Sequence, residues 1–138
     1  MQHNLNPYWD DLIFSINIEQ LSSKPSSQPW LRYLKVHICE HSTGNRAIIP
    51  EYPCRFGHTP PIEELLSYFL HKSQLYVKAL DSQMEPHLFM MQHFQLNDSA
   101  QGLATFHQAQ DCFNSLCALL KGTELDVETL RMILEIED

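Results

Sequence analysis

The stretch from Trp30 to Cys39 alternates between two sets of side chains, and this alternation constrains the fold more than any other feature of the chain. Residues two apart lie on the same face of a strand, so a period of two predicts a half-buried β-strand. One face would carry Trp30, Leu34, Val36 and Ile38, and the other Leu31, Tyr33, Lys35 and His37. Turn-forming residues at 42–45 and a short run at 46–49 then predict a hairpin that closes at Pro50.

Two later stretches have helical spacing. Thr59 and the two prolines after it, followed by acidic residues at 63 and 64, are typical of a helix N-terminus. The buried face of this helix would consist of Ile62, Leu65, Leu66, Phe69 and Leu70. The residues 97–99 predict the capped start of a longer helix that ends at Gly122. Its inward face would recur every three or four positions, with Leu103, Phe106, Gln110, Phe113, Cys117 and Leu120.

The remaining segments complete an α+β pattern. Asn6 and Pro7 predict a first helix, with Trp9, Leu12, Ile13 and Ile16 on one face, although Leu12–Ile18 is also compatible with a strand. Residues 51–61 read as a loop, 75–80 and 87–96 as a second hairpin, and a last helix starts at Asp126. The sequence therefore predicts one α+β domain over residues 1–138, an antiparallel twisted sheet from two hairpins with flanking helices.

Composition and charge narrow the class of protein. The chain has 138 residues, is 43% hydrophobic and carries a net charge of −8. Nucleic-acid binding depends on clustered Lys and Arg, which this chain does not have. Its longest apolar run, 116–120, is far shorter than the roughly 20 residues of a membrane span. Because the N-terminus shows no signal peptide, we expect a cytoplasmic protein with four reduced cysteines, no membrane partner and no nucleic-acid partner.

Four residues could form a zinc site. Cys39 and His41 end one predicted strand, and Cys54 and His58 lie in the following loop. Two thiolates and two imidazoles are a suitable tetrahedral set for Zn²⁺, which would make the protein a small zinc-stabilised adaptor. The spacing argues against it, because Cys-x-His places both ligands on the same strand face, and our main expectation is that no cofactor is bound.

No catalytic motif is visible. The four glycines do not form a phosphate-binding loop, and neither GxSxG nor HExxH occurs. The acidic pairs 10–11 and 63–64 lie at predicted helix starts, where the helix dipole accounts for them. Cys117 lies on the predicted apolar face of its helix and is explained by core packing. We therefore expect a protein that binds a macromolecule and is not an enzyme.

The order of these elements resembles the class I chaperones of type III secretion systems. The similar stretch is Ala79–Leu120, about 42 residues, with Leu88–Met91 as a strand and Phe106 and Phe113 on the following helix. The resemblance implies a homodimer in which Leu65 and Phe69 contribute to the dimer contact. It also implies that a secreted effector is held in the cytosol as an extended segment, by strand addition and shallow apolar pockets. The residues that would bind it are Trp9, Leu12, Ile13, Ile16, Trp30, Leu34 and Val36.

A second class of protein fits the composition equally well. Immunity or inhibitor proteins that block a toxin enzyme are often small and acidic, because many toxin active sites are basic. The net charge does not distinguish them from chaperones. A dimer that retains an unfolded segment favours the chaperone, whereas a monomer that binds a folded nuclease favours the inhibitor.

Overall fold

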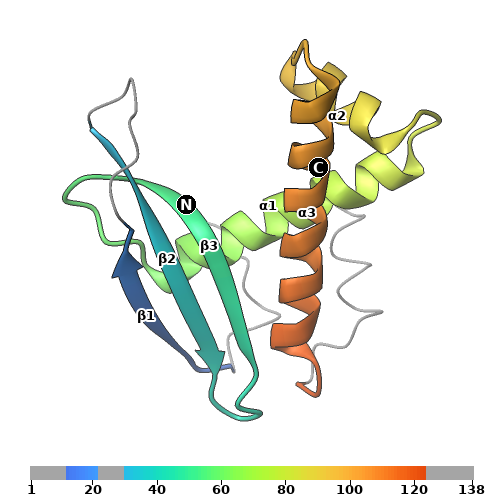
Figure 1. The fold of residues 1–138 in the computed structure, drawn as a ribbon. Helices are drawn as coiled ribbons and strands as arrows, with labels where there is room; N and C mark the ends of the chain where they lie inside the picture. The colour runs from blue at the N-terminus through green and yellow to red at the C-terminus, as the bar shows by residue number, and fades with distance from the viewer. Residues whose placement is uncertain (1–11, 22–29, 124–138) are drawn as a thin grey trace, which may run out of the picture.

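The fold consists of a three-stranded sheet followed by three helices (Figure 1), and this confirms the predicted α+β class. The computed structural model describes residues 12–21 and 30–123. The elements are β1 (Phe14–Gln20), β2 (Leu31–Glu40), β3 (Arg46–Arg55), α1 (Ile62–Asp81), α2 (Pro86–Phe94) and α3 (Ser99–Leu120). The predicted helix start at Asn6, the loop 22–29 and the predicted helix from Asp126 lie outside the described residues.

The sheet is antiparallel, in the order β1-β2-β3, and β2 is its central strand. The predicted hairpin is confirmed, although β3 runs to Arg55 and so takes up half of the predicted loop 51–61. Of the two interpretations of Leu12–Ile18, the strand is confirmed and the helix is wrong over the described residues. Leu12 and Ile16 fit one face of a helix, but they also occupy every second position, as the residues on one face of a strand do. Pairing with β2 favours the strand.

A β-bulge interrupts the pairing of β2 with β3. Leu34 pairs with Tyr52 and Val36 pairs with Ile49, so Lys35 alone faces the two residues Pro50 and Glu51. The extra residue shifts the alternation of β3 by one position. As a result both Ile49 and Tyr52 point into the core, although they are three residues apart.

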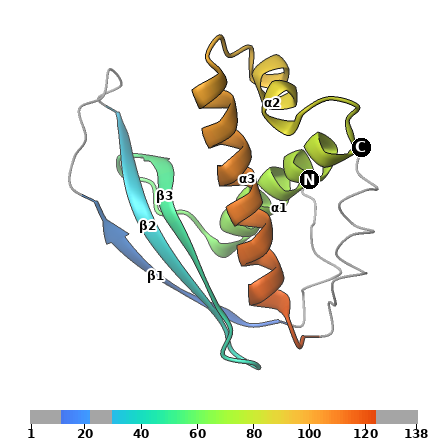
Figure 2. The ribbon, with the colours of Figure 1, turned by 45° about the vertical axis from the view of Figure 1, so that its right-hand side comes forward.

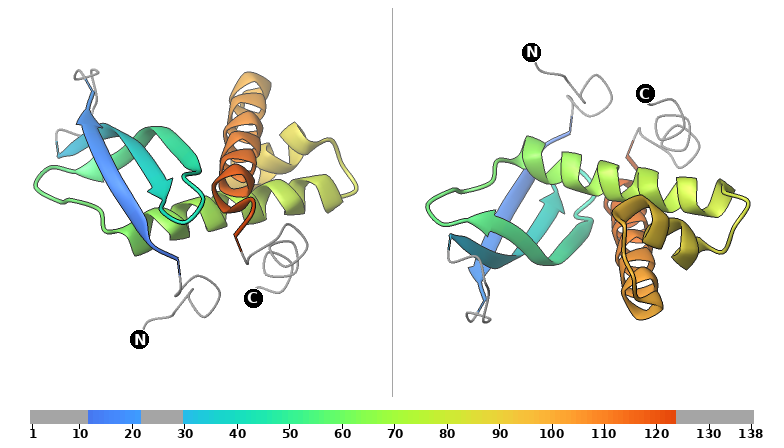
Figure 3. Two further views of the ribbon diagram at one scale, coloured as in Figure 1. Left: turned by 90° about the horizontal axis from the view of Figure 1, so that it is seen from below. Right: turned by 90° about the horizontal axis from the view of Figure 1, so that it is seen from above.

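The helices α1 and α3 cover one face of the sheet, which we call the inner face. The first half of α1 packs against it and α3 stands beside β3 (Figures 1 and 3). Figure 2 shows that β1 is the strand farthest from α3. The largest fully buried side chains of this core are Leu34, Val36, Ile38, Ile49, Leu65, Phe69, Leu116, Leu119 and Leu120. The opposite, outer face of the sheet has no helix of the described residues on it (Figure 3).

The predicted second hairpin is wrong. Residues 75–80 continue α1, which runs without a break to Asp81, and residues 86–94 form α2. No glycine or proline interrupts the chain between Pro61 and Pro86, so nothing in the sequence ends the helix earlier. The second half of α1 packs with α2 and α3 around a smaller core of Ala79, Met90 and Ala109 (Figure 3). The strand Leu88–Met91, on which the chaperone resemblance partly rests, is therefore a helix.

The helix α3 is confirmed, but a different face of it is buried. The buried residues are Gly102, Ala109, Cys112, Leu116, Leu119 and Leu120, whereas Leu103 is 45% exposed. Two predicted inward residues, Phe106 and Phe113, are half-buried and lie against Tyr76 of α1. None of the helices formed by the described residues is long and apolar enough to span a membrane.

Candidate functional site

The structure separates the four predicted zinc ligands. Cys39 pairs with Arg46 next to the β2–β3 turn, whereas Cys54 pairs with Arg32 near the other end of the sheet. Arg32 and Cys39 are seven residue steps apart along β2, which corresponds to roughly 23 Å. Among residues 12–21 and 30–123 no three His, Cys, Asp or Glu side chains are grouped as metal ligands would be. The predicted zinc site is therefore wrong.

Cys54 and His58 instead belong to a hydrogen-bonded cluster that holds the loop before α1. The Cys54 thiol donates to the carbonyl oxygen of His58 at 3.2 Å, and Arg32 donates to the same oxygen at 2.9 Å. The His58 ring nitrogen Nε2 lies 2.8 Å from Glu64 Oε1, and the Tyr52 hydroxyl donates to the other oxygen of that carboxylate. These contacts tie β3 to the first turn of α1.

The ionisable groups of this cluster are in the protonation states that a structural role requires. Burial raises the pKa of the Cys54 thiol, so the thiol is protonated at neutral pH and is a poor nucleophile. Burial of Glu64 opposes its ionisation, but hydrogen bonds from Tyr52 and His58 lower its pKa below the ordinary value. Burial and the neighbouring Glu64 both raise the pKa of Tyr52. The ionised carboxylate is thus the acceptor that both neighbours require.

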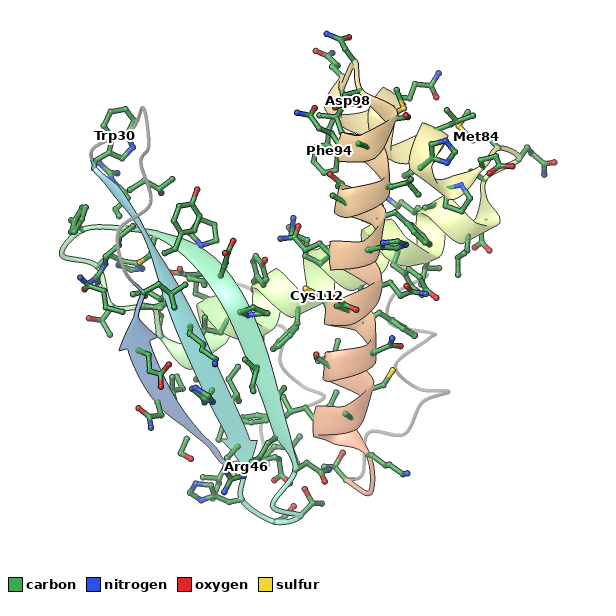
Figure 4. The ribbon with its side chains drawn as sticks, viewed as in Figure 1. Trp30, Arg46, Met84, Phe94, Asp98 and Cys112 are labelled. Carbon is green, nitrogen blue, oxygen red and sulfur yellow. The ribbon has the colours of Figure 1, made fainter. Side chains whose placement is uncertain are left out.

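A cleft of about 450 Å³ lies between β3, α1 and α3. Its walls include Pro50, Tyr68, Asp111 and Cys112, and Cys112 lies near the middle of α3 (Figure 4). Burial raises the pKa of the Cys112 thiol to about 11, which keeps that thiol protonated too. Neither Cys54 nor Cys112 is therefore an activated nucleophile.

The predicted partner-binding residues do not form one surface. Leu34 and Val36 are fully buried in the inner-face core, so their assignment to a binding surface is wrong. Ile13 and Trp30 are exposed, at 62% and 53%, but they lie beyond opposite ends of the sheet. Leu12 and Ile16 are half-buried, and Trp9 lies outside the described residues.

The predicted dimer contact is also not on the surface. Leu65 and Phe69 of α1 are fully buried against the sheet of their own chain. They face the sheet because the spacing of apolar residues in α1 puts them on its inward side. A dimer of this fold has to use other residues.

Among residues 12–21 and 30–123, the edge of β1 that faces away from β2 is the feature that can engage another chain. Leu21 donates to Tyr33 O at 3.2 Å and His41 donates to Ile13 O at 2.8 Å, which fixes the odd-numbered residues of β1 as those hydrogen-bonded to β2. The even-numbered residues therefore direct their backbone N–H and C=O groups away from β2. These residues are Phe14, Ile16, Ile18 and Gln20. Among the described residues no strand lies beyond β1.

The other edge of the sheet, on β3, is protected. Phe56 donates to Trp30 O, so Tyr52 and Cys54 bond to β2, and Pro53 between them points outward. Proline has no N–H to offer, and Pro50 in the bulge lacks one as well. Proline, bulges and charges are common devices that prevent strand addition, and β1 has no proline and only one charged residue, Glu19.

A hollow on the outer face lies directly beside the free edge. We call it the outer-face hollow; its volume is about 640 Å³. Ser15 of β1, Cys39 of β2 and Arg46 of β3 lie in one row across the sheet. The small side chains of Ser15 and Cys39 form part of the floor of the hollow. Arg46 and Trp30 mark opposite ends of the sheet (Figure 4). Its lining residues are Ser15, Ile16, Asn17, Glu19, His37, Ile38, Cys39, Arg46, Ala47 and Ile48.

Sequence reasoning named two residues of this site, Ile16 as a partner-binding residue and Cys39 as a zinc ligand. The available signal was the strand interpretation of Leu12–Ile18, but an edge strand cannot be distinguished from a central one by alternation alone. The prolines of β3 were recognised as loop formers, and not as protection of an edge. A comparison with family models, curated proteins and solved structures finds no match to this chain.

Proposed function

We propose that the protein binds an extended segment of another protein, which adds to the sheet as a fourth strand alongside β1. The difference between the two edges of the sheet carries this proposal. On β1 the even-numbered residues present their N–H and C=O groups, whereas Pro50 and Pro53 interrupt the donors of β3. Strand addition takes its affinity from such main-chain hydrogen bonds.

Side chains of the added strand would provide specificity. On the inner face they would lie beside Phe14, Ile16 and Ile18, which are only half-buried, and would cover them further. On the outer face they would reach the outer-face hollow. Both faces favour a segment in which apolar and polar residues alternate.

This function keeps the main expectation from the sequence, that the protein works by binding and not by catalysis. Class I secretion chaperones, which the sequence resembles, hold extended effector segments, and a secreted effector in the cytoplasm is the partner that this resemblance suggests. The proposal itself uses only the edge of β1, since the strand Leu88–Met91 is helical.

The charge distribution gives little support to the inhibitor alternative. Residues 12–21 and 30–123 contain nine acidic residues against seven Lys and Arg, so they carry only −2 of the net charge of −8. Most of the excess acid belongs to the segments outside them. The described fold therefore does not present the strongly acidic surface that a basic active site would select.

The test uses two substitutions of one outward-pointing residue. Ile18→Pro removes an N–H that β2 does not use, while Ile18→Ala removes the same side chain and keeps that N–H. Random dodecapeptides are selected on the wild-type protein, and their affinities are measured by fluorescence anisotropy. We expect binding to fall at least about tenfold in Ile18→Pro and much less in Ile18→Ala, because main-chain pairing provides the affinity.

Backbone amide exchange provides a second measurement that needs no variant. A bound peptide should slow the exchange of the outward amides of Ile16, Ile18 and Gln20 in the wild-type protein. Peptides that bind Ile18→Pro as tightly as wild type, or that protect only amides outside β1, would overturn the proposal. Circular dichroism shows whether each variant is folded.

A further inference from the structure

The sequence of β1 is self-complementary. Asn17 lies at the centre of Phe14–Gln20, with isoleucine at 16 and 18 on either side. A two-fold axis at Asn17 would place Ile16 of one copy opposite Ile18 of a second copy, and Phe14 opposite Gln20. These even-numbered residues are the ones whose N–H and C=O groups point away from β2, so the hydrogen-bonding groups of the two edges meet.

The same register matches the side chains. On the inner face two isoleucines lie side by side and continue the core across the axis. On the outer face Asn17 faces Asn17 of the second copy, and Glu19 faces Ser15 of the second copy. This register places no like charges opposite each other. Like charges in directly opposite positions would oppose pairing.

The outer-face hollow receives the carboxylate of Glu19 from the second copy. In this register Glu19 of a second copy lies in the same row as Ser15, Cys39 and Arg46 of the first. The Cα atoms of Arg46 and the incoming Glu19 are three inter-strand spacings apart, roughly 14 Å, so the two side chains meet only when both extend along the sheet. Ser15 and Cys39 between them are small, and the hollow above them leaves the space for this. The two-fold axis repeats this pairing, which gives two equivalent contacts between Glu19 and Arg46.

From this geometry we infer that two copies of the chain pair through β1 into one continuous six-stranded sheet, with each Glu19 directed into the outer-face hollow of the other copy. Such a contact is isologous, as most dimer interfaces are. It uses neither Leu65 nor Phe69. The inference does not depend on the proposed function, but it uses the same edge, so a segment that adds to β1 would compete with the second copy.

Charge reversal tests the ion pairs, with sedimentation equilibrium as the measurement. The wild-type protein should reach twice the chain mass of 16.1 kDa. Glu19→Arg and Arg46→Glu should each weaken the dimer about tenfold, and the double variant should restore it, because opposite charges across an interface are exchangeable in this way. Glu51→Arg and Arg55→Glu on β3 are matched controls and should leave the dimer unchanged.

Cross-linking tests the register. Asn17 and its symmetry mate form a non-hydrogen-bonded pair with Cα atoms roughly 4.5 Å apart, which a disulfide can bridge. With Cys39 and Cys117 replaced by serine, Asn17→Cys should give a covalent dimer on mild oxidation, and Ser15→Cys should not. Equal cross-linking of both variants would overturn the register.

The failures of the two proposals are distinguishable. A wild-type protein that stays at 16.1 kDa at every concentration overturns the dimer. The proposed function would stand in that case if selected peptides still depend on the N–H of Ile18. If the charge reversals change the dimer as expected but no selected peptide depends on this N–H, the dimer inference stands and the proposed function is overturned.

Discussion

The side-chain amide nitrogen of Asn45 lies 3.1 Å from the carbonyl oxygen of Leu119, so the β2–β3 turn caps the C-terminal end of α3. The same nitrogen donates to the carbonyl oxygen of Lys121. The last carbonyl groups of a helix have no partner within the helix, and here a residue more than seventy positions away provides one. The hairpin and the last described helix are therefore joined by polar contacts as well as by the core.

Removing this cap should destabilise the fold. Asn45→Ala should lower the free energy of unfolding by about 1–2 kcal/mol, because it leaves helix-end carbonyls without their donor. Urea denaturation followed by circular dichroism measures the change. Asn97→Ala, at an exposed loop residue, is the control and should have little effect; equal losses in the two variants would contradict the capping role.

Glu40 should make stability depend on pH. Its side chain is fully buried, which by itself favours the protonated form, but the hydroxyl and amide groups of Thr43 and Ser42 donate to it and lower its pKa to about 2. Because the pKa in the folded state lies below the ordinary value of 4.5, the stabilisation is complete above about pH 4.5 and is lost as the pH falls toward 2.

The matched variant is Glu40→Gln. At neutral pH its free energy of unfolding should be about 2–3 kcal/mol lower than that of the wild type. This difference should shrink as the pH is lowered from about 4.5 toward 2. Denaturation curves at a series of pH values measure it. A difference that stays constant from neutral pH to pH 2 would show that the carboxylate charge is not what stabilises the turn.

Gly102 sets the distance between α2 and α3. A Cβ atom at this position would lie 2.6 Å from the carbonyl oxygen of His87 and 2.7 Å from Cγ of Met91. Alanine is the better helix former by about 1 kcal/mol, but the contact with backbone should outweigh this gain, so Gly102→Ala should destabilise the protein by about 1–3 kcal/mol. Thermal unfolding measures it.

The control for that experiment is the opposite exchange at an exposed site. Ala104→Gly should destabilise α3 only through helix propensity, by about 1 kcal/mol. A stabilised Gly102→Ala variant would mean that the two helices can separate at little cost.

The four thiols should differ in reactivity. Cys54 and Cys112 are buried and burial raises the pKa of both, whereas Cys39 and Cys117 are half-buried. Since the thiolate is the reactive species, Cys54 and Cys112 should react at least about tenfold more slowly with a maleimide at neutral pH. Mass spectrometry after partial labelling identifies the modified residues. Early labelling of Cys54 would contradict its burial in the hydrogen-bonded cluster before α1.

The strand β2 was predictable because its signal is local. In β2, every second residue from Leu34 to Glu40 is buried, and the alternation in the sequence reports that burial directly. The start of α3 was predictable for the same reason: Asp98 accepts from the N–H of Ala100 at 3.0 Å, as a capping residue should.

The second half of α1 was misread because it is packed on more than one side. Ala79 is fully buried against α2 and α3, while Leu75, Tyr76 and Val77 are each partly buried, so no single helical face stands out. Over six residues such a pattern also fits a strand. Only the packing of three helices together resolves it.

The buried face of α3 was missed because part of it consists of small residues. Gly102 and Ala109 are buried where helices approach closely, and a search for large apolar side chains passes over them. The candidate site was missed for a related reason. Whether a strand such as β1 has a neighbour on each side is decided by the topology of the whole sheet, which no local pattern contains.

The bulge at Pro50 and Glu51 gives β3 one residue more than its pairing with β2 needs. Removal of either residue would restore strict alternation, and Tyr52 and Cys54 would still face the core, because one outward residue would then separate Ile49 from Tyr52. The hydroxyl of Tyr52 would still face Glu64. A deletion of one residue should therefore be tolerated better at the bulge than at Pro53, where either Tyr52 or Cys54 would have to turn toward solvent.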